Sequence, residues 1–392
     1  MKKRIYLFSI GAIILCICML LSFLPQINMY SYAYKCKREL YKVKSKIDIT
    51  DNTFKGLELL ESDIDNNYIF LAGEAHGSIK SIDMNLYLLK YFIEKGDIKY
   101  ILYESGYADS QYLNRYLDTG DESILEYLFE KSSGTMSYTM ENYNLLKSIY
   151  EYNLTLEKDK KIMFVGIDKE NPEVAIKYIK TLLPGKETNN TKVKQFNNIV
   201  YWLNKNNYVD ESKKALELIR TSQKDIEEYW GVDYFHIEYL LNNLSQSVGQ
   251  LFREELLINN FKKLYEYLPK GKYFGQFGGA HTNLNPVTKS LATYLQNEYE
   301  YTKDKVVSID YKYNDSYSYI PTGLNVDSKL EEYIDSIFFP RYRSTILIKL
   351  NYENSIYYEK DIYLNQNNPE IKCYQYMILF SDSKAANHYH KK

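Results

Sequence analysis

The sequence predicts an α/β protein with a mostly parallel sheet, flanking helices and an all-helical insertion, preceded by an N-terminal transmembrane helix. Short apolar runs alternate with segments of helical apolar spacing, as in parallel βαβ units. A long stretch between two of these runs shows only helical patterns, and an uncharged apolar segment lies near the N-terminus. The strand candidates are residues 68–72, 100–103, 161–167, 272–277, 305–310, 345–350 and 374–380.

The N-terminal segment, residues 5–24, contains no charge and is long enough to span a bilayer. Three basic residues precede it, whereas residues 25–34, which follow it, contain no charged residue. This asymmetry favours a single-pass cell-membrane protein whose domain lies outside the cytoplasm. We divide the chain into an anchor or signal segment at 1–30, a basic stalk at 31–50, and an α/β domain at 51–392.

Within that domain, the first strand–helix–strand unit has the length of a parallel βαβ crossover. The insertion, at about 190–268, is predicted to form three long helices that pack over the sheet edge or the mouth of a site. These three are 197–206, 211–228 and 234–267. Further helices are predicted at 57–64, 82–94, 110–117, 124–130, 138–159, 171–183 and 285–297.

Composition excludes some function classes. The formal net charge is −2 and no basic face stands out, so nucleic acid is not an expected partner. Four cysteines include no CxxC pair, which argues against a structural zinc site or a thioredoxin-like motif. The 43 tyrosines are scattered along the chain and indicate a compositional bias rather than an aromatic carbohydrate-binding surface.

Titratable side chains follow four of the predicted strands. In open parallel sheets, the loops at the carboxyl ends of the strands build the ligand crevice. The sequence therefore predicts one polar site at this edge. Its members from strand ends are Glu74 with His76, Glu104, Asp168 and His281.

A carboxylate beside an imidazole, as in Glu74 and His76, suits the activation of water, and it also suits metal binding. If a divalent metal is present, the candidate ligands are His76, Glu104 and His281. There is no Gly-x-Ser-x-Gly elbow, Walker loop or Gly-x-Gly-x-x-Gly after a strand. Water is therefore the expected nucleophile. By pattern alone, Arg253 is a solvated helix charge.

Six segments, in this order, resemble the erythromycin esterase/ChaN-like superfamily. The first is Gly73-Glu74-Ala75-His76-Gly77, similar to the family's opening Gly-Glu-x-His-Gly segment. Each motif is short, but together they extend over residues 68–380. The other five lie at residues 103–107, 165–168, 253–260, 278–283 and 374–380.

The resemblance implies that His76 is the general base and that Glu74 and Glu104 position it or the water. It also implies that His281 and Arg253 complete the pocket. The helical insertion would then cover the substrate cleft.

For substrate binding we name Asp168 and Asn259 as candidates. The chain departs from the macrolide-cleaving members in three places. In its opening segment, Glu74 and His76 are one residue closer together. Asn85 stands where those members tend to carry a basic residue, and Lys80 is the nearest basic residue. Its last segment has a single histidine. The resemblance therefore leaves the substrate open.

The leading hypothesis is an erythromycin-esterase-like hydrolase that cleaves an ester, lactone or amide in a small-molecule or peptide substrate. It requires no cofactor beyond the divalent metal that the histidines allow. Antibiotic resistance is a role that the resemblance permits. Two alternatives stay open: a divalent-metal-dependent peptidase of Tiki type, and a haem- or ligand-binding surface protein of ChaN type.

Overall fold

The computed structural model describes residues 30–391 except 33, 52, 247–252, 286, 322–325, 331–341, 354, 356–362, 366–367 and 370–372. The predicted transmembrane segment, residues 5–24, lies outside the described part. Within the described part, no helix is long and apolar enough to cross a membrane.

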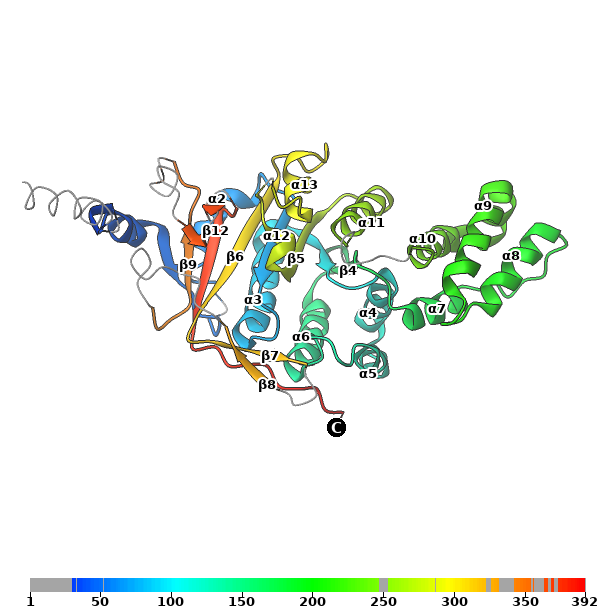
Figure 1. The fold of residues 1–392 in the computed structure, drawn as a ribbon, viewed down its shortest axis with the longest axis horizontal. Coiled ribbons are helices and arrows are strands. Elements are labelled where there is room, and N and C mark those ends of the chain that lie inside the picture. The colour runs from blue at the N-terminus through cyan, green and yellow to red at the C-terminus, as the bar shows by residue number, and fades with distance from the viewer. Residues whose placement is uncertain are drawn as a thin grey trace, which may run out of the picture.

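An eight-stranded sheet forms the centre of the molecule, in the order β1-β9-β12-β6-β2-β5-β3-β4 (Figure 1). The six strands from β12 to β4 are parallel, and β9 and β1 add an antiparallel edge. This confirms the predicted α/β class and the mostly parallel sheet. The strands are β1 (Lys44–Lys46), β2 (Ile69–Glu74), β3 (Ile98–Tyr103), β4 (Met163–Gly166), β5 (Lys272–Gly278), β6 (Val306–Asn314), β9 (Ile346–Lys349) and β12 (Tyr376–Ser381).

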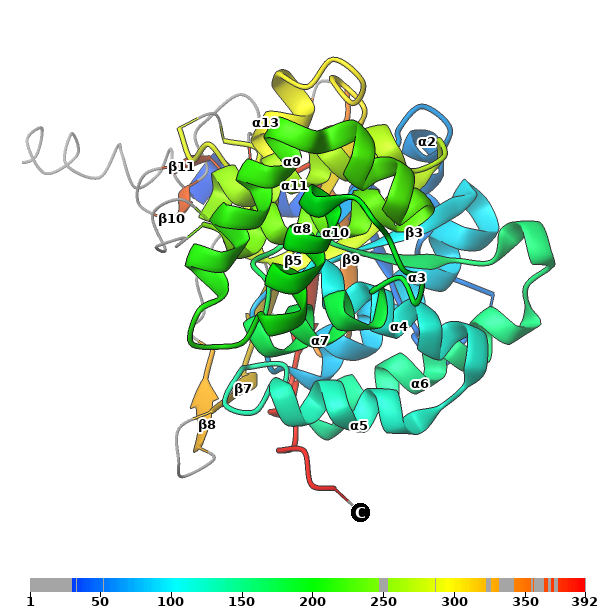
Figure 2. The ribbon, with the colours of Figure 1, turned by 90° about the vertical axis from the view of Figure 1, so that its right-hand side faces the viewer.

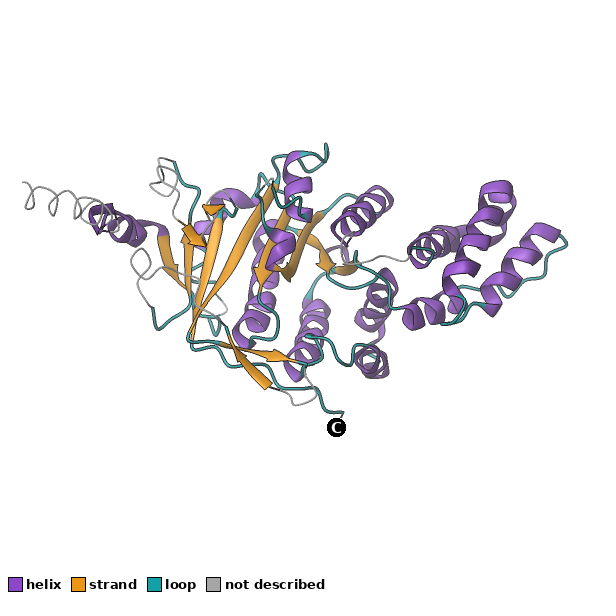
Figure 3. Cartoon of the chain, in the orientation of Figure 1, coloured by secondary structure: helices purple, strands orange, loops and turns teal. Residues whose placement is uncertain are grey.

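Helices lie on both sides of the sheet (Figure 3). The connection from β2 through α3 (Ile79–Gly96) to β3 runs in one direction across the sheet. The connection from β5 through α12 (Gly279–Thr282) and α13 (Leu291–Asn297) to β6 runs in the other. Because crossovers between parallel strands are right-handed, these two connections cover opposite faces. With both faces covered, the central strands are almost wholly buried and read as apolar runs.

The chain between β3 and β4 forms three helices, α4 (Tyr107–Thr119), α5 (Glu122–Lys131) and α6 (Met140–Thr155). Helix α4 packs against β4, and α6 packs against α3. Before β2, the predicted helix at 57–64 is a 3-10 turn, η1 (Glu58–Leu60), followed by α2 (Glu61–Ile64).

The predicted helical insertion is present as α8 (Thr191–Trp202), α9 (Tyr208–Trp230) and α10 (Tyr234–Leu244), after α7 (Pro172–Thr181). Figure 1 shows α8 and α9 at the right-hand end, beyond the edge strand β4, and Figure 2 shows them in front of the sheet from that side. Where the sequence predicts one helix at 234–267, the structure has α10 and a separate helix, α11 (Arg253–Tyr267).

Residues 31–50, predicted as a stalk, instead contribute to the fold. Residues 34–43 are helical, and β1 pairs with β9 at the edge of the sheet. Cys36 and Leu40 are buried against Ile348 and Met377. The pairing of β1 with β9 could not be predicted from the local sequence, because the two strands lie about three hundred residues apart in the chain. Four short strands were also not predicted: β7 (Tyr317–Ile320), β8 (Val326–Lys329), β10 (Tyr363–Asn365) and β11 (Asn368–Pro369).

The last described residues, 381–391, form what we call the C-terminal strap. It runs beside the loop that follows β2 and pairs with it: the amide of Ala386 donates to the carbonyl of Gly77 (2.8 Å), and the amide of Ile79 donates to that of Lys384 (3.0 Å). The hydroxyls of Ser78 and Ser383 lie 2.6 Å apart. The strap therefore holds the loop that carries His76.

Candidate active site

The four strands that carry the predicted site residues are neighbours in the sheet, in the order β2-β5-β3-β4. Their carboxyl ends lie at one edge, as predicted. The imidazoles at 76 and 281 meet there on either side of Gly278. A Cβ added to this glycine would lie 3.1 Å from Nε2 of His76 and 3.7 Å from Cδ2 of His281.

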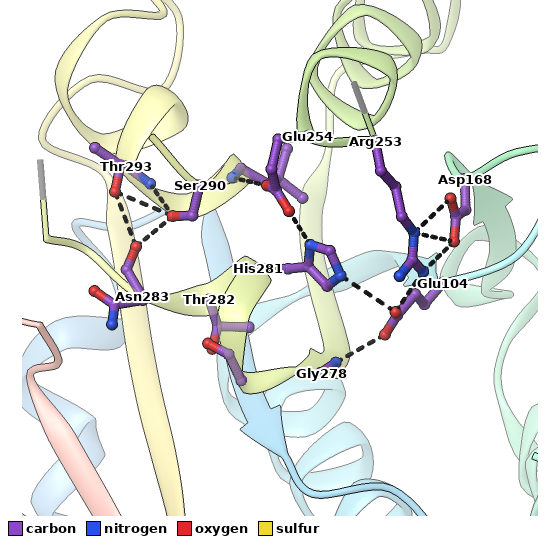
Figure 4. A network of polar contacts seen from close by, with 12 residues as sticks. Glu104, Asp168, Arg253, Glu254, Gly278, His281, Thr282, Asn283, Ser290 and Thr293 are labelled. Atoms are coloured by element: carbon purple, nitrogen blue, oxygen red, sulfur yellow. Dashed lines mark hydrogen bonds and ion pairs between the residues drawn. The ribbon is translucent and has the colours of Figure 1, made fainter. Parts of the chain in front are cut away.

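Glu104, the first residue after β3, faces His281 and Arg253 (Figure 4) and is within ion-pair distance of both histidines. Its Oε1 is 3.5 Å from Nε2 of His281, and its Oε2 is 3.9 Å from Nε2 of His76. The Gly278 amide donates to Oε2 (2.8 Å), and Nη2 of Arg253 donates to Oε1 (2.7 Å). Four donors or cations from four other segments thus surround one carboxylate: the loop after β2, strand β5, and helices α11 and α12.

His76 is held by the acid two residues before it. Its Nδ1 donates to Oε1 of Glu74 (2.9 Å), and the other oxygen of Glu74 accepts from Nε2 of Gln276 (2.7 Å). Burial lowers the pKa of His76, but the hydrogen bond and charge of Glu74, together with the charge of Glu104, outweigh burial and raise that pKa to about 9.

The opening segment differs from the sequence expectation in one detail. Glu74 is the last residue of β2 rather than a residue that follows it, so its backbone is fixed by strand pairing. Gly73 leaves room for α12, because a Cβ there would clash with Oγ1 of Thr282.

His281 has its own carboxylate, which the sequence analysis missed. The residue lies on the short helix α12, and its Nδ1 donates to Oε1 of Glu254 from α11. The other oxygen of Glu254 accepts from the amide of Leu291 (2.7 Å). Burial lowers the pKa of His281, but Glu104 and Glu254 outweigh it and raise that pKa to about 9. The one sequence signal for Glu254 was its place beside Arg253.

The charges of the cluster stabilise one another. Burial raises the pKa of Glu104, but the hydrogen bond of His281, the charges of both histidines and the Gly278 amide hold it down to about 2. At neutral pH, Glu104 is therefore a carboxylate between two imidazolium rings. The two histidines titrate as a coupled pair because they share this carboxylate.

Arg253 joins the cluster to Asp168. Its Nη2 pairs with both Glu104 and Asp168, and its Nε donates to Oδ1 (3.1 Å) and Oδ2 (3.2 Å) of Asp168. The hydrogen bond to Asp168 is the main reason that the pKa of Arg253 rises further above its ordinary value. The Asp168 side chain is only 6% exposed. Asp168, predicted to bind substrate, thus has its carboxylate engaged by Arg253.

Asn259, also predicted to bind substrate, is not brought to the cluster. It is exposed on α11, and the buried residue is its neighbour Asn260, whose Nδ2 donates to the carbonyl of Ile167 (2.9 Å). Lys80, the basic residue nearest to Asn85, is not part of the cluster either. Its ammonium donates to the carbonyl of Ser381.

The three candidate metal ligands, His76, Glu104 and His281, converge, but they do not form a ligand set for a metal ion. Both oxygens of Glu104 already accept from Arg253 and the Gly278 amide, and the cation at Arg253 opposes a second positive charge. Within the described ranges, no group of three His, Cys, Asp or Glu side chains could hold a metal ion.

Solved structures with the same fold are known. A Bacillus cereus protein superposes with a TM-score of 0.67 at 18% identity, over 91% of this chain and 99% of that one. A succinoglycan biosynthesis protein gives 0.68 at 16%, over 92% and 99%. A histidine-to-asparagine mutant of erythromycin esterase EreC, in its open conformation, gives 0.60 at 14%, over 88% and 98%.

At these identities, the likeness concerns the fold. The chain has the fold of erythromycin esterase, which is the fold that the resemblance of its six segments implied. No protein-family model and no curated protein sequence matches it.

Proposed function

We propose that the protein is a hydrolase that cleaves an ester, lactone or amide bond with water activated by His76. The main support is the arrangement of two imidazoles on one carboxylate. Each histidine directs Nε2 at Glu104 and has Nδ1 held by a carboxylate of its own, Glu74 or Glu254. A carboxylate on Nδ1 fixes the tautomer whose Nε2 can accept a proton.

The difference in exposure assigns the two roles. The side chain of His76 is 38% exposed and that of His281 is 10% exposed. Water reaches His76 more readily, so His76 is the general base. It acts after losing its proton, and because its pKa is raised to about 9, the active neutral form increases on the alkaline side of pH 7. His281 stays between Glu104 and Glu254, where both acids favour its protonated form. It is the general acid.

The reaction then follows in two steps. His76 takes a proton from water while the water oxygen bonds to the carbonyl carbon, and the carbonyl oxygen becomes negative. Arg253 and the protonated His281 are the cations that stabilise this charge. The bond to the leaving oxygen or nitrogen breaks as His281 gives it a proton. His76 then releases its proton to solvent, to which its side chain is 38% exposed, and His281 takes up a proton in its place, which restores the starting state.

The shared fold makes esters and lactones the first substrates to test, since erythromycin esterase is named for such a bond. A panel should contain aryl esters, a macrolide and an aryl amide. His76→Asn and Glu74→Gln are expected to lower turnover about 100-fold or more with folding unchanged. His390→Asn, at an exposed histidine of the strap, is the matched control.

Turnover at the wild-type rate in His76→Asn would reject the proposal. Hydrolytic silence of the wild type on the whole panel, together with a Soret band on haem titration, would favour ligand binding instead.

For the N-terminal segment, residues 5–24, we propose a single-pass anchor with the α/β domain outside the cytoplasm. The apolar length and the flanking charges support this. Alkaline extraction of membranes and protease digestion of intact cells test it. Release of the full-length chain by alkali, or protection from protease, would overturn it.

A further inference from the structure

We propose that Gln276, held by Tyr311, is a positioning residue that fixes the orientation of Glu74 and thereby of His76. The effect on turnover rests on the proposed function, because it presupposes that His76 is the base. The effect on the His76 ring does not, since it depends only on the contacts of Gln276.

The three side chains come from three adjacent strands. Gln276 on β5 lies opposite Ala72 of β2 in register, so it shares a face of the sheet with Ala72 and Glu74. Tyr311 comes from β6, on the other side of β2. Its hydroxyl crosses over β2 and donates to Oε1 of Gln276 (3.0 Å). The small side chain of Ala72 leaves room for this contact.

The hydrogen bonds determine which way the amide of Gln276 faces. The carbonyl of Ser81 can only accept, so the NH2 group faces it and donates to it (3.2 Å). The same NH2 group donates to Oε2 of Glu74 (2.7 Å). The amide oxygen then points to the Tyr311 hydroxyl, so the amide is held at both ends.

This arrangement decides which oxygen of Glu74 faces His76. Oε2 is occupied by Gln276, and Oε1 is left for Nδ1 of His76. Without the amide, the carboxylate can rotate about its last bond, and Nδ1 loses its acceptor for part of the time. Gln276 and Tyr311 are 9% and 3% exposed, so water cannot readily replace either partner.

The position does not require a polar residue for packing. Gln276 lies between Gly275 and Phe277 in the buried part of β5, and a methionine has nearly the same length and shape. Replacing it therefore removes the hydrogen bonds with little change in volume. A purely structural role would make Gln276→Met a stability variant only.

The experiment follows the titration of the His76 ring by NMR, with its signal assigned by loss in His76→Asn. In Gln276→Met, the pKa of His76 is expected to fall by about one unit, towards its ordinary value, because Glu74 no longer stays on Nδ1. Tyr311→Phe is expected to give a smaller shift of the same sign. In the activity assay, kcat falls about tenfold or more with KM little changed.

The matched control is Gln375→Met. Gln375 also bridges the sheet through two hydrogen bonds, from the Ser308 amide (2.7 Å) and to the Val306 carbonyl (3.0 Å). It precedes β12, a strand that β6 separates from β2. The variant Gln375→Met should leave the titration of His76 unchanged.

The outcomes separate the two proposals. A wild-type titration of His76 in Gln276→Met overturns the positioning role, whatever the activity. A lowered pKa in a protein with no hydrolytic activity sustains the positioning role and leaves the proposed function unsupported. Equal shifts in Gln276→Met and Gln375→Met also overturn it, since they would show a general effect on the sheet.

Discussion

Glu254 holds Nδ1 of His281 on the side of the ring opposite Glu104. It gives His281 the same partner that Glu74 gives His76. The cluster therefore contains two acid–imidazole pairs that face one shared carboxylate. The acids differ in origin, because one ends a strand and the other begins a helix.

Glu254→Gln should slow turnover by about tenfold or more, because His281 loses the charge that keeps it protonated and oriented. Its pKa, raised to about 9 in the wild type, should fall. Steady-state kinetics and NMR titration measure the two effects. Glu255→Gln, at the exposed neighbour, is the control and should behave as wild type. Equal losses in both variants would contradict the role of Glu254.

Stability should be greatest between about pH 4.5 and 6.5. The folded state raises the pKa of His76 and His281 from 6.5 to about 9, so their stabilisation is complete below pH 6.5 and is lost as the pH rises to 9. It lowers the pKa of Glu104 from 4.5 to about 2, so that stabilisation is present above pH 4.5 and is lost as the pH falls to 2.

Melting temperatures across this range, in buffers of constant ionic strength, test the expectation. His281→Asn should flatten the alkaline side and also reduce the slope on the acid side, because its hydrogen bond helps to hold the pKa of Glu104 down. Glu104→Gln should reduce the slope on both sides because the histidines lose their shared carboxylate. A wild-type melting temperature that rises from pH 6.5 to 9 would contradict these assignments.

Arg253→Met should lower the free energy of unfolding by about 2–3 kcal/mol, because it leaves Glu104 and Asp168 without their cation. The figure is reduced from that of a fully buried pair, since 34% of the Arg253 side chain is exposed. Adding Asp168→Asn should restore part of the loss. Urea unfolding of the four proteins gives the coupling energy, and strictly additive losses would show that the pair contributes nothing.

Ala386→Pro should lower kcat with little effect on KM, because it removes the amide that donates to Gly77 beside His76. Lys391→Pro, at the exposed end of the strap, is the control. Kinetics and melting temperature are measured together. An unchanged kcat in Ala386→Pro would show that the strap does not position the loop.

The sequence predicted the acids and histidines at strand ends for a physical reason. A polar group directly after an apolar strand must lie at the carboxyl edge of a parallel sheet, so Glu74, Glu104, Asp168 and His281 converge. The short apolar runs also predicted each of the strands β2 to β6. Strands in the middle of the sheet are buried on both faces, so their residues are mostly apolar.

What could not be predicted depends on contacts between distant segments. The local sequence around Glu254 is that of a solvated charge on a helix. Only the packing of α11 in the folded protein brings it to His281 on α12. Asn259 and Asn260 are adjacent, and the rotation of α11 alone decides which of them is buried. The edge strand β1 has no apolar pattern of its own and is recognised through its pairing with β9.

The ion pair of Asp168 and Arg253 joins residues 85 positions apart, one before and one after the helical insertion. The ion pair joins the two ends of the insertion, so the distances inside the cluster do not depend on the length of the chain between them. Helices α8 and α9 could therefore be exchanged for a segment of different size while the reacting groups keep their places. Under the proposed function, the chemistry of these groups would survive such an exchange.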